Sequence, residues 1–239
     1  MITLYTTQPF WGLASPSPAC MKLETWLRMA KIDYQIDPSA NLAIAPKGKV
    51  PFIAYQGQLI GDSTLIIEMF KSQEGIDLDA DLTAYEKAIS VAFRRMIKEN
   101  IYWGCGYVRY GVEENWQIYR EALISMIKDS VPIEQCDLMV EGFYKIFQEQ
   151  IHAHGLGRHN DQEITQIMMA DFQSLSDFLG DKPFFMGDKP TTLDATAYAY
   201  IANTIKPPFK HPIIDFVLNL DNLCQHSDRM TQEFFSELA

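Results

Sequence analysis

The sequence predicts an α/β domain with a small sheet, followed by an all-α domain. Strand-like runs of β-branched and aromatic residues occur only before residue 80, and from Thr83 onward the chain shows helical spacing interrupted by Gly and Pro. A chain of 239 residues, 47% of them hydrophobic, can bury two modest cores. We therefore expect domains over residues 1–77 and 83–239, joined by an acidic linker whose interspersed leucines predict that it packs against the protein.

The first predicted elements are a strand over residues 2–7 and a helix that begins at Pro18. The strand run, ITLYTT, is β-branched and aromatic, and it ends in a loop rich in Pro and Gly. Ser17 is a good N-cap, and Pro18 suits the first helical position. Apolar residues then recur at helical spacing and predict one buried face, formed by Leu23, Trp26, Leu27 and Ala30.

A short strand, a hairpin and a second helix complete the predicted first domain. The run YQI predicts a strand over residues 34–36, and a Gln-Gly turn joins predicted strands over 51–55 and 58–60. A helix with one apolar face follows Ser63. The order strand, helix, strand, irregular crossover, hairpin and helix, in fewer than 80 residues, predicts a thioredoxin-like sheet.

Charge and cysteine usage argue against several functional classes. The formal net charge of −11 would repel nucleic acid and anionic lipid. The four cysteines are far apart and form no C-x-x-C pair, which argues against a zinc ribbon or a dense disulfide framework and favours a reducing compartment. Because no long apolar run or targeting segment is evident, we expect a cytoplasmic protein without a membrane span or a nucleic-acid partner.

The chain resembles the cytosolic glutathione transferase superfamily. The resemblance rests on the string KVPFI at residues 49–53, the acid–serine pair Asp62-Ser63, the small first domain and the helical second domain. The strings SPSPACMKLETWLRMA, APKGKVPFI, HGLGRH and DKPFFMGDKPTTLDATAYAYI resemble the branch that holds the failed axon connections proteins and, more distantly, the metaxins. The resemblance implies a glutathione transferase fold, glutathione as co-substrate and a homodimer.

Ser17 is the candidate catalytic residue. It stands first in a string with the spacing of a C-P-x-C redox motif, S-P-A-C. A glutathione-dependent enzyme must favour the thiolate of its substrate, and a hydroxyl at a helix N-terminus does so. Ser15 and Tyr5 are alternatives for the same role, and Ser17 can also be only an N-cap. Cys20 occupies the position that is buried in thioredoxin-like folds, so a small buried side chain is the favoured interpretation, and a glutaredoxin-like activity would depend on it alone.

The resemblance also implies a glutathione-binding set. A cis peptide bond before Pro51 would turn the backbone of Val50 outward to pair with the tripeptide. Ser63 and the N–H groups of its helix would receive the γ-glutamyl carboxylate, and Asp62 would face the ammonium, although both can be simple helix caps. Lys49, with Lys47, is either a partner of the glycyl carboxylate or a solvated surface lysine.

A second-substrate pocket is expected on the first long helix of the second domain. We expect this helix to contain all of the clustered aromatic residues, and its pocket to take a hydrophobic, aromatic or lipid-like electrophile. Core packing would account for some of the cluster. The candidate residues are Tyr102, Trp103, Tyr107 and Arg109, followed by Tyr110 and Trp116.

Two further motifs are interpreted as structural. The string TTLD at residues 191–194 predicts a capping box in which Asp194 reaches back to the N–H of its own N-cap. His152, His154 and His159 lie around a glycine-terminated helix end, where they suit the helix dipole better than a metal ion, so no metal is expected.

Two functions follow from these patterns. The first is a glutathione transferase in which the thiolate of bound glutathione attacks a hydrophobic electrophile. The alternative is a metaxin-like interaction or scaffold module that keeps the fold without the activity.

Overall fold

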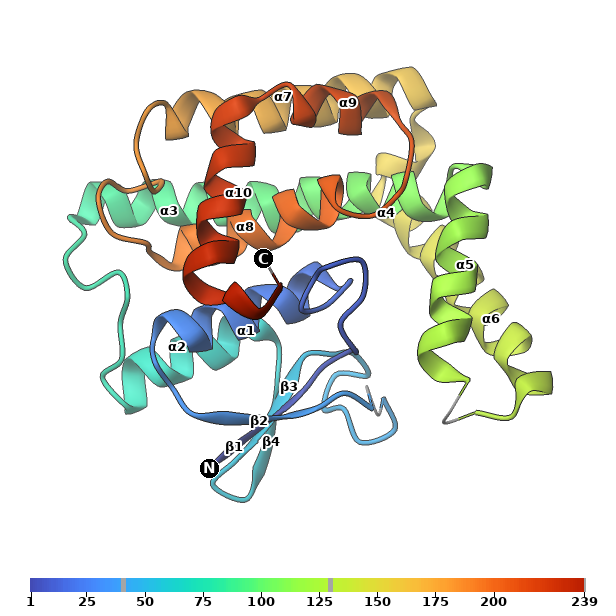
Figure 1. Ribbon diagram of the computed structural model, residues 1–239, viewed down its shortest axis with the longest axis horizontal. Coiled ribbons are helices and arrows are strands. Elements are labelled where there is room, and N and C mark those ends of the chain that lie inside the picture. The colour runs from blue at the N-terminus through green and yellow to red at the C-terminus, as the bar shows by residue number, and fades with distance from the viewer. Residues whose placement is uncertain (40–41, 129–130, 239) are drawn as a thin grey trace.

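A four-stranded mixed sheet forms the base of the protein, and helices cover it, in a computed structural model that describes residues 1–39, 42–128 and 131–238 (Figure 1). The strand order is β2-β1-β3-β4, with β1 parallel to β2 and antiparallel to β3. The thioredoxin-like sheet predicted from the sequence is confirmed. The strands are β1 (Ile2–Tyr5), β2 (Tyr34–Asp37), β3 (Phe52–Tyr55) and β4 (Gln58–Gly61).

Two helices, α1 (Pro18–Met29) and α2 (Ser63–Gln73), lie between the sheet and the remaining helices (Figure 1). Leu23, Trp26 and Leu27 of the predicted apolar face of α1 are fully buried, whereas Ala30 is the C-cap of the helix and is half-buried. The indole Nε1 of Trp26 donates a hydrogen bond of 3.2 Å to the hydroxyl of Thr192 in the helical part. The helix is therefore shared between two layers rather than covering the sheet alone.

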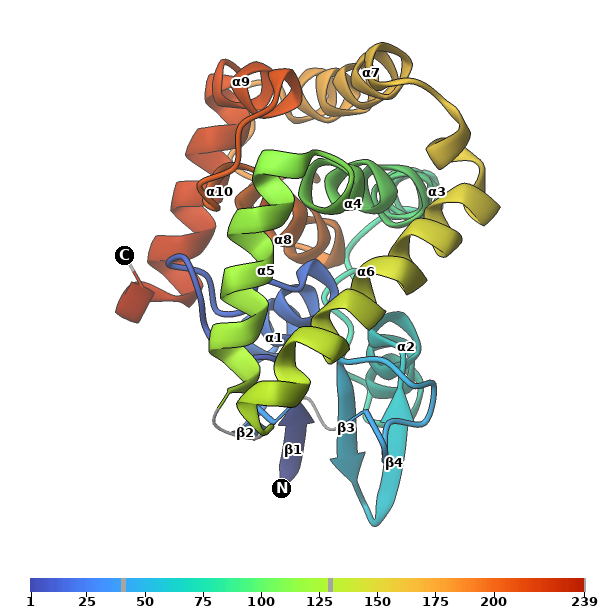
Figure 2. The ribbon, with the colours of Figure 1, turned by 90° about the vertical axis from the view of Figure 1, so that its right-hand side faces the viewer.

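The chain after Thr83 is helical, and within the described residues no strand follows β4. Helices α3 and α4 run as one rod joined by a π-helical turn, and α5 and α6 stand together at one end (Figures 1 and 2). The elements are α3 (Ala84–Met96), the π-helical turn (Ile97–Ile101), α4 (Tyr102–Tyr110), α5 (Glu113–Ile127), α6 (Ile133–His154), a 3₁₀ turn (Leu156–Arg158), α7 (Asp161–Leu179), α8 (Thr192–Ile205), α9 (Pro212–Leu218), α10 (Asp221–Phe234) and a 3₁₀ turn (Ser236–Leu238).

The prediction that one helix carries all the aromatic residues from Tyr102 to Trp116 is wrong. Helix α4 ends at Tyr110, and Trp116 lies on α5. The chain turns at Gly111, where a Cβ atom would collide with the ring and carbonyl of Tyr107. The turn folds α5 back so that the rings of Tyr110 and Trp116 stack with centroids 5.5 Å apart.

Helix α8 is the buried centre of the helical part, and its predicted capping box is present. Asp194 is fully buried and accepts hydrogen bonds from the N–H and hydroxyl of Thr191 at 2.8 and 2.9 Å. Its other oxygen accepts from the N–H of Phe185 at 2.8 Å and lies 3.0 Å from Nε2 of the buried His226. The carboxylate therefore organises three segments, and not only the start of its own helix.

Two further contacts join the sheet part to the helices. The acidic linker packs down as expected, through Asp79, which is 4% exposed, pairs with Lys71 at 2.6 Å and accepts from the N–H of Thr192 at 2.9 Å. Arg109 is buried and donates to the carbonyl of Pro16, at 2.6 Å, and to the carbonyl and side-chain oxygens of Asn203. The loop that precedes α1 is thus held from the helical side.

Candidate functional site

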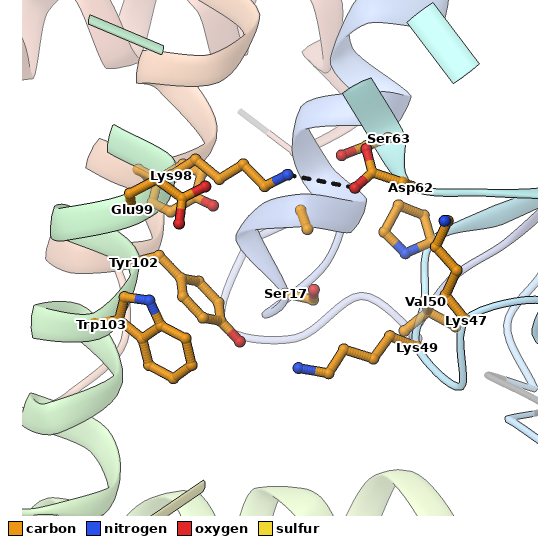
Figure 3. Close-up of a pocket in the computed structure, with 13 residues that line it drawn as sticks. Ser17, Lys47, Lys49, Val50, Asp62, Ser63, Lys98, Glu99, Tyr102 and Trp103 are labelled. Atoms are coloured by element: carbon orange, nitrogen blue, oxygen red, sulfur yellow. Dashed lines mark hydrogen bonds and ion pairs between the residues drawn. The ribbon is translucent and has the colours of Figure 1, made fainter. Parts of the chain in front are cut away.

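A cavity of about 290 Å³ lies where the sheet part meets the rod formed by α3 and α4 (Figure 3). This volume is close to the ~300 Å³ lower end of the range for small-molecule sites. The N-terminus of α1, the loop before β3, the start of α2, the π-helical turn, α4 and α8 all contribute to the wall. The cavity brings together nine residues singled out from the sequence, namely Ser17, Lys47, Lys49, Val50, Pro51, Asp62, Ser63, Tyr102 and Trp103.

Ser17 lies at the N-cap of α1 and lines this cavity (Figure 3). Its side chain makes no capping hydrogen bond, so the hydroxyl is not consumed by the role that N-cap serines usually have. Ser15, the first alternative, is fully buried and is occupied by the hydroxyl of Thr7, at 2.6 Å, and by the N–H of Ser17. Tyr5, the second alternative, stacks on Phe52 in the sheet. The geometry favours Ser17 over both.

The thiol of Cys20 is fully buried below this position. Burial raises its pKa above the ordinary 9.0, although the hydroxyls of Ser17, Thr6 and Ser15 act in the opposite direction. A buried, protonated thiol is a poor nucleophile. This arrangement argues against a glutaredoxin-like role for Cys20.

The loop before β3 supplies a backbone wall and two cations. The Val50–Pro51 peptide bond is cis, as expected, and both residues line the cavity. Lys47 and Lys49 are exposed at the rim. The ammonium of Lys49 extends across the mouth toward Tyr102 and Trp103 (Figure 3), and it donates a hydrogen bond of 3.3 Å to the side chain of Gln150 on α6.

Asp62 and Ser63 begin α2 at the opposite wall. One carboxylate oxygen of Asp62 accepts from the N–H groups of Thr64 and Leu65, and the other pairs with Lys98 at 3.3 Å (Figure 3). Burial acts to raise the pKa of this carboxyl, but these hydrogen bonds and Lys98 outweigh it and hold the pKa below its ordinary value. The backbone of Asp62 is left-handed, with φ of 75°, a costly conformation that is often found at functional sites. Its carboxylate is thus both a helix cap and a charged part of the cavity wall.

Four cavity residues were missed by the sequence reasoning: Ala19, Lys98, Glu99 and Tyr200. Lys98 and Glu99 lie on the π-helical turn and line the same wall as Tyr102, which follows them by four and three residues. Such turns recur at functional sites. Spacings of three and four residues place side chains on one helix face, so the pattern around Tyr102 could also have pointed to Lys98 and Glu99.

A second, smaller cavity of about 160 Å³ adjoins the first, and Ser17 and Tyr102 line both. Its wall is largely aromatic, with Tyr110 from α4, Tyr119 from α5 and Phe147 from α6. Burial raises the pKa of the Tyr102 hydroxyl and raises that of Tyr110 well above 10, so both phenols stay protonated.

One face of α4 accounts for this second wall. Tyr102, Cys105, Gly106 and Arg109 recur at the i, i+3, i+4, i+7 spacing of one helical face, and all four line the cavity. A Cβ atom at Gly106 would overlap the ring of Phe147, so the glycine permits the close approach that closes the wall. That spacing was readable in the sequence, whereas Tyr119 and Phe147 are contributed by distant segments.

Two of the four residues expected in the second-substrate pocket, Tyr107 and Arg109, are not free to contact a ligand there. Tyr107 lines neither cavity, and its hydroxyl donates to Asp161 at 3.0 Å. It lies five residues from Tyr102, roughly 140° around the helix. Arg109 does line the second cavity, but its guanidinium is committed to Pro16 and Asn203 and lies over the ring of Tyr119. Tyr102 and Trp103 therefore remain as the predicted residues that face ligand-sized space.

His152 and His154 lie in the last turn of α6, which ends at Gly155, as expected. His154 stacks on Trp103, and His159 pairs with Glu163 at 3.2 Å. Across the described ranges, no three His, Cys, Asp or Glu side chains gather in a way that could hold a metal ion. A search of the same residues found no helix with the length and apolarity needed to cross a membrane.

Two family models match this chain. The family model described as the glutathione S-transferase N-terminal domain matches residues 18–116, and that of the glutathione S-transferase C-terminal domain matches residues 168–230. The chain belongs to the glutathione S-transferase superfamily. The predicted family and fold are both confirmed.

Among relatives of this superfamily member, the isoprene-epoxide–glutathione S-transferase of Rhodococcus sp. (strain AD45) is 29% identical, over 98% of this chain and 99% of the relative. The failed axon connections protein of Drosophila melanogaster is 31% identical over 94% of this chain, which spans only 56% of that relative's length. A metaxin-1 homolog of the same organism is 23% identical over 97% of this chain and 72% of the relative. Enzymes and proteins of the failed axon connections and metaxin groups are thus both among its relatives.

The solved structures that match share the fold. The β-etherase LigF of Sphingobium sp. strain SYK-6 superimposes with a TM-score of 0.63, over 99% of both chains, at 16% identity. An identity this low shows the fold alone.

Proposed function

We propose that this protein binds glutathione in the polar cavity and transfers its thiolate to a hydrophobic electrophile held in the adjoining aromatic cavity. The observation that carries the proposal is the position of Ser17, whose residue borders both cavities and whose hydroxyl is not used as a helix cap. A sulfur atom placed beside that hydroxyl would lie at the junction of the two cavities. Holding the thiolate and the electrophile side by side would lower the entropic cost of their reaction.

The charges of the polar cavity suit the three charged groups of the tripeptide. Glutathione carries two carboxylates and one ammonium. Lys47 and Lys49 are available for the glycyl carboxylate, and Ser63 with the N-terminus of α2 for the γ-glutamyl carboxylate. Asp62 supplies the negative charge for the ammonium, and the backbone of Val50 is available for the peptide groups.

The proposed step is a nucleophilic substitution. The thiol loses its proton to solvent, and the thiolate is stabilised by the Ser17 hydroxyl and the N-terminus of α1. The sulfur attacks carbon, the C–S bond forms as the bond to the leaving atom breaks, and the electron pair departs with that atom. The similarity to the Rhodococcus enzyme makes an alkene epoxide the first electrophile to assay. In the reaction with an epoxide, the C–O bond breaks and the oxygen takes a proton from solvent.

Replacement of Asp62 by Asn is expected to weaken glutathione binding roughly tenfold, because a charge-assisted hydrogen bond to the ammonium is lost while the helix cap can persist. Isothermal titration calorimetry with glutathione measures this loss. Asp177→Asn, an exposed change of the same kind on α7, is the matched control and should bind normally.

The same pair of proteins should be titrated with a glutathione analogue that lacks the amino group. If Asp62 faces the ammonium, wild type and Asp62→Asn will bind the analogue equally. A tenfold difference that persists with the analogue would contradict the assignment of this carboxylate.

An interaction or scaffold module is the second candidate, favoured by the similarity to the failed axon connections protein and the metaxin. It predicts that the folded protein does not bind glutathione even at millimolar concentration. Such a result would overturn the transferase proposal, and any measurable turnover of an epoxide would exclude a purely structural role.

We also propose that the protein acts as a cytoplasmic homodimer, as its resemblance to cytosolic transferases implies. Light scattering after size-exclusion chromatography distinguishes a monomer of 27.4 kDa from a dimer of twice that mass.

A further inference from the structure

A third cavity, of about 230 Å³, lies outside the site described above. It is enclosed by α1, α2, α3 and α8, where the sheet part meets the helical part on the far side of Asp62. Its charged lining residues are Lys22 from α1, Glu68 from α2, Arg94 and Arg95 from α3, and Lys98 from the π-helical turn.

Positive charge dominates this cavity in a protein whose net charge is −11. Four cations face one carboxylate, Glu68, which lies 3.9 Å from Lys71 outside the cavity lining. Lys98 is paired with Asp62, but Lys22, Arg94 and Arg95 make no ion pair with any described residue. Such a concentration of like charge is destabilising unless an opposite charge joins it.

One of these cations, Lys22, is buried with a single hydrogen bond, and the half-buried Arg94 has a buried donor without a partner. Lys22 is only 6% exposed, and its ammonium makes one hydrogen bond, to the hydroxyl of Thr64 at 3.3 Å. The Nε atom of Arg94 is buried and has no hydrogen-bond partner among the described residues. Because buried donors are almost always satisfied and buried charges are almost always paired, both observations point to a missing acceptor.

Burial without an anionic partner also affects the pKa of Lys22. Burial lowers the pKa of its ammonium to about 7, with the positive charges of Lys98, Arg94 and Arg95 acting in the same direction and only Asp62 opposing them. An anion bound among these side chains would restore the charged form of the lysine.

We propose that this cavity is a binding site for a small oxyanion, of the phosphate or sulfate type, held by Lys22, Arg94 and Arg95. Guanidinium groups present paired N–H donors that match the oxygens of such an anion, and the ammonium at the base adds a point charge. The cavity is larger than one such ion. Leu65 and Val91 make part of its wall apolar, which suits the organic group of a phosphomonoester. The site is separate from the proposed glutathione cavity and does not depend on it.

Binding can be tested with inorganic sulfate, which stays a dianion throughout the relevant pH range, and by comparing inorganic phosphate with phenyl phosphate, an organic monoester. Calorimetry at low ionic strength, with chloride at matched ionic strength as the reference, is expected to show saturable binding of sulfate. Tighter binding of phenyl phosphate than of inorganic phosphate would identify an organic ligand as the source, and equal binding would identify the free ion.

Lys22→Met and Arg95→Gln should each weaken sulfate binding roughly tenfold. Lys206→Met, which removes an exposed charge at the end of α8 remote from the cavity-lining Thr192, is the matched control and should bind as wild type does. Arg95 is exposed, so its replacement keeps the test valid even if the change at Lys22 alters folding. Sulfate binding should also weaken above about pH 7, as Lys22 loses its proton, and the Lys22→Met protein should lack this dependence.

The absence of saturable sulfate and phenyl phosphate binding to wild type would overturn the proposal, as would normal binding by both variants. If neither probe binds but Arg95→Gln changes the molecular mass in solution, these cations contact a second copy of this chain, and the oxyanion proposal is also overturned. A protein that binds sulfate but not glutathione would keep this site while contradicting the proposed function.

Discussion

Replacing Ser17 with Ala is expected to lower kcat/KM for an epoxide roughly 100-fold while leaving the affinity for glutathione nearly unchanged. The hydroxyl is proposed to act on the thiolate and not on the peptide groups of the ligand. Its loss should therefore raise the pKa of bound glutathione by roughly 1–2 units. The thiolate absorbance of the binary complex, followed as a function of pH, measures this shift directly without any electrophile.

Ser15→Ala is the matched control for this experiment. Ser15 is buried, is bonded to Thr7 and the N–H of Ser17, and does not line the cavity. Its removal should reduce stability while the thiolate absorbance of the complex titrates as in wild type. A thiol that titrates normally in Ser17→Ala but not in Ser15→Ala would reverse the assignment of the two serines.

Replacing Asp194 with Ala is expected to destabilise the fold by roughly 3–5 kcal/mol, or a Tm lower by about 10 °C. The carboxylate is fully buried, and its loss leaves donors of Thr191, Phe185 and His226 without an acceptor. Differential scanning calorimetry measures the change. Glutathione affinity of the folded fraction should be unaffected, because Asp194 does not line the polar cavity.

A second capping box in the same chain provides the comparison. Glu86 makes the same kind of bond to the N–H of Thr83 at the start of α3, but this box is exposed to solvent. Glu86→Ala should therefore lower the Tm far less than Asp194→Ala. Equal losses would show that burial of Asp194 adds nothing to its role as a cap.

The first part of the fold was predictable because its signals are local. The strand at residues 2–5 and the helix that begins at Pro18 follow from β-branched runs, capping residues and helical spacing within a few residues of each other. The glutathione-binding candidates were found from a family resemblance in which Val50, Pro51, Asp62 and Ser63 stand in order. Their roles remain proposals, and the structure adds that all four border one cavity. The domain boundary between residues 77 and 83 likewise stays a prediction.

The rest of the site depends on contacts between distant segments. Tyr119 and Phe147 reach the aromatic cavity because α5 and α6 fold back against α4. Asp79 was assigned to a linker, yet it is buried against Thr192, 113 residues away along the chain. No pattern within a window of the sequence carries that information.

The bonds of Arg109, Asp79 and Trp26 across the two parts of the chain have a consequence for unfolding. Arg109 on α4 holds the loop before α1, while Asp79 and Trp26 both reach Thr192 at the start of α8. Separating the sheet part from the helical part would leave buried donors and acceptors unpaired on both sides. Neither part would then keep its stability after the other unfolds. The sheet and the helices are therefore expected to unfold as one cooperative unit.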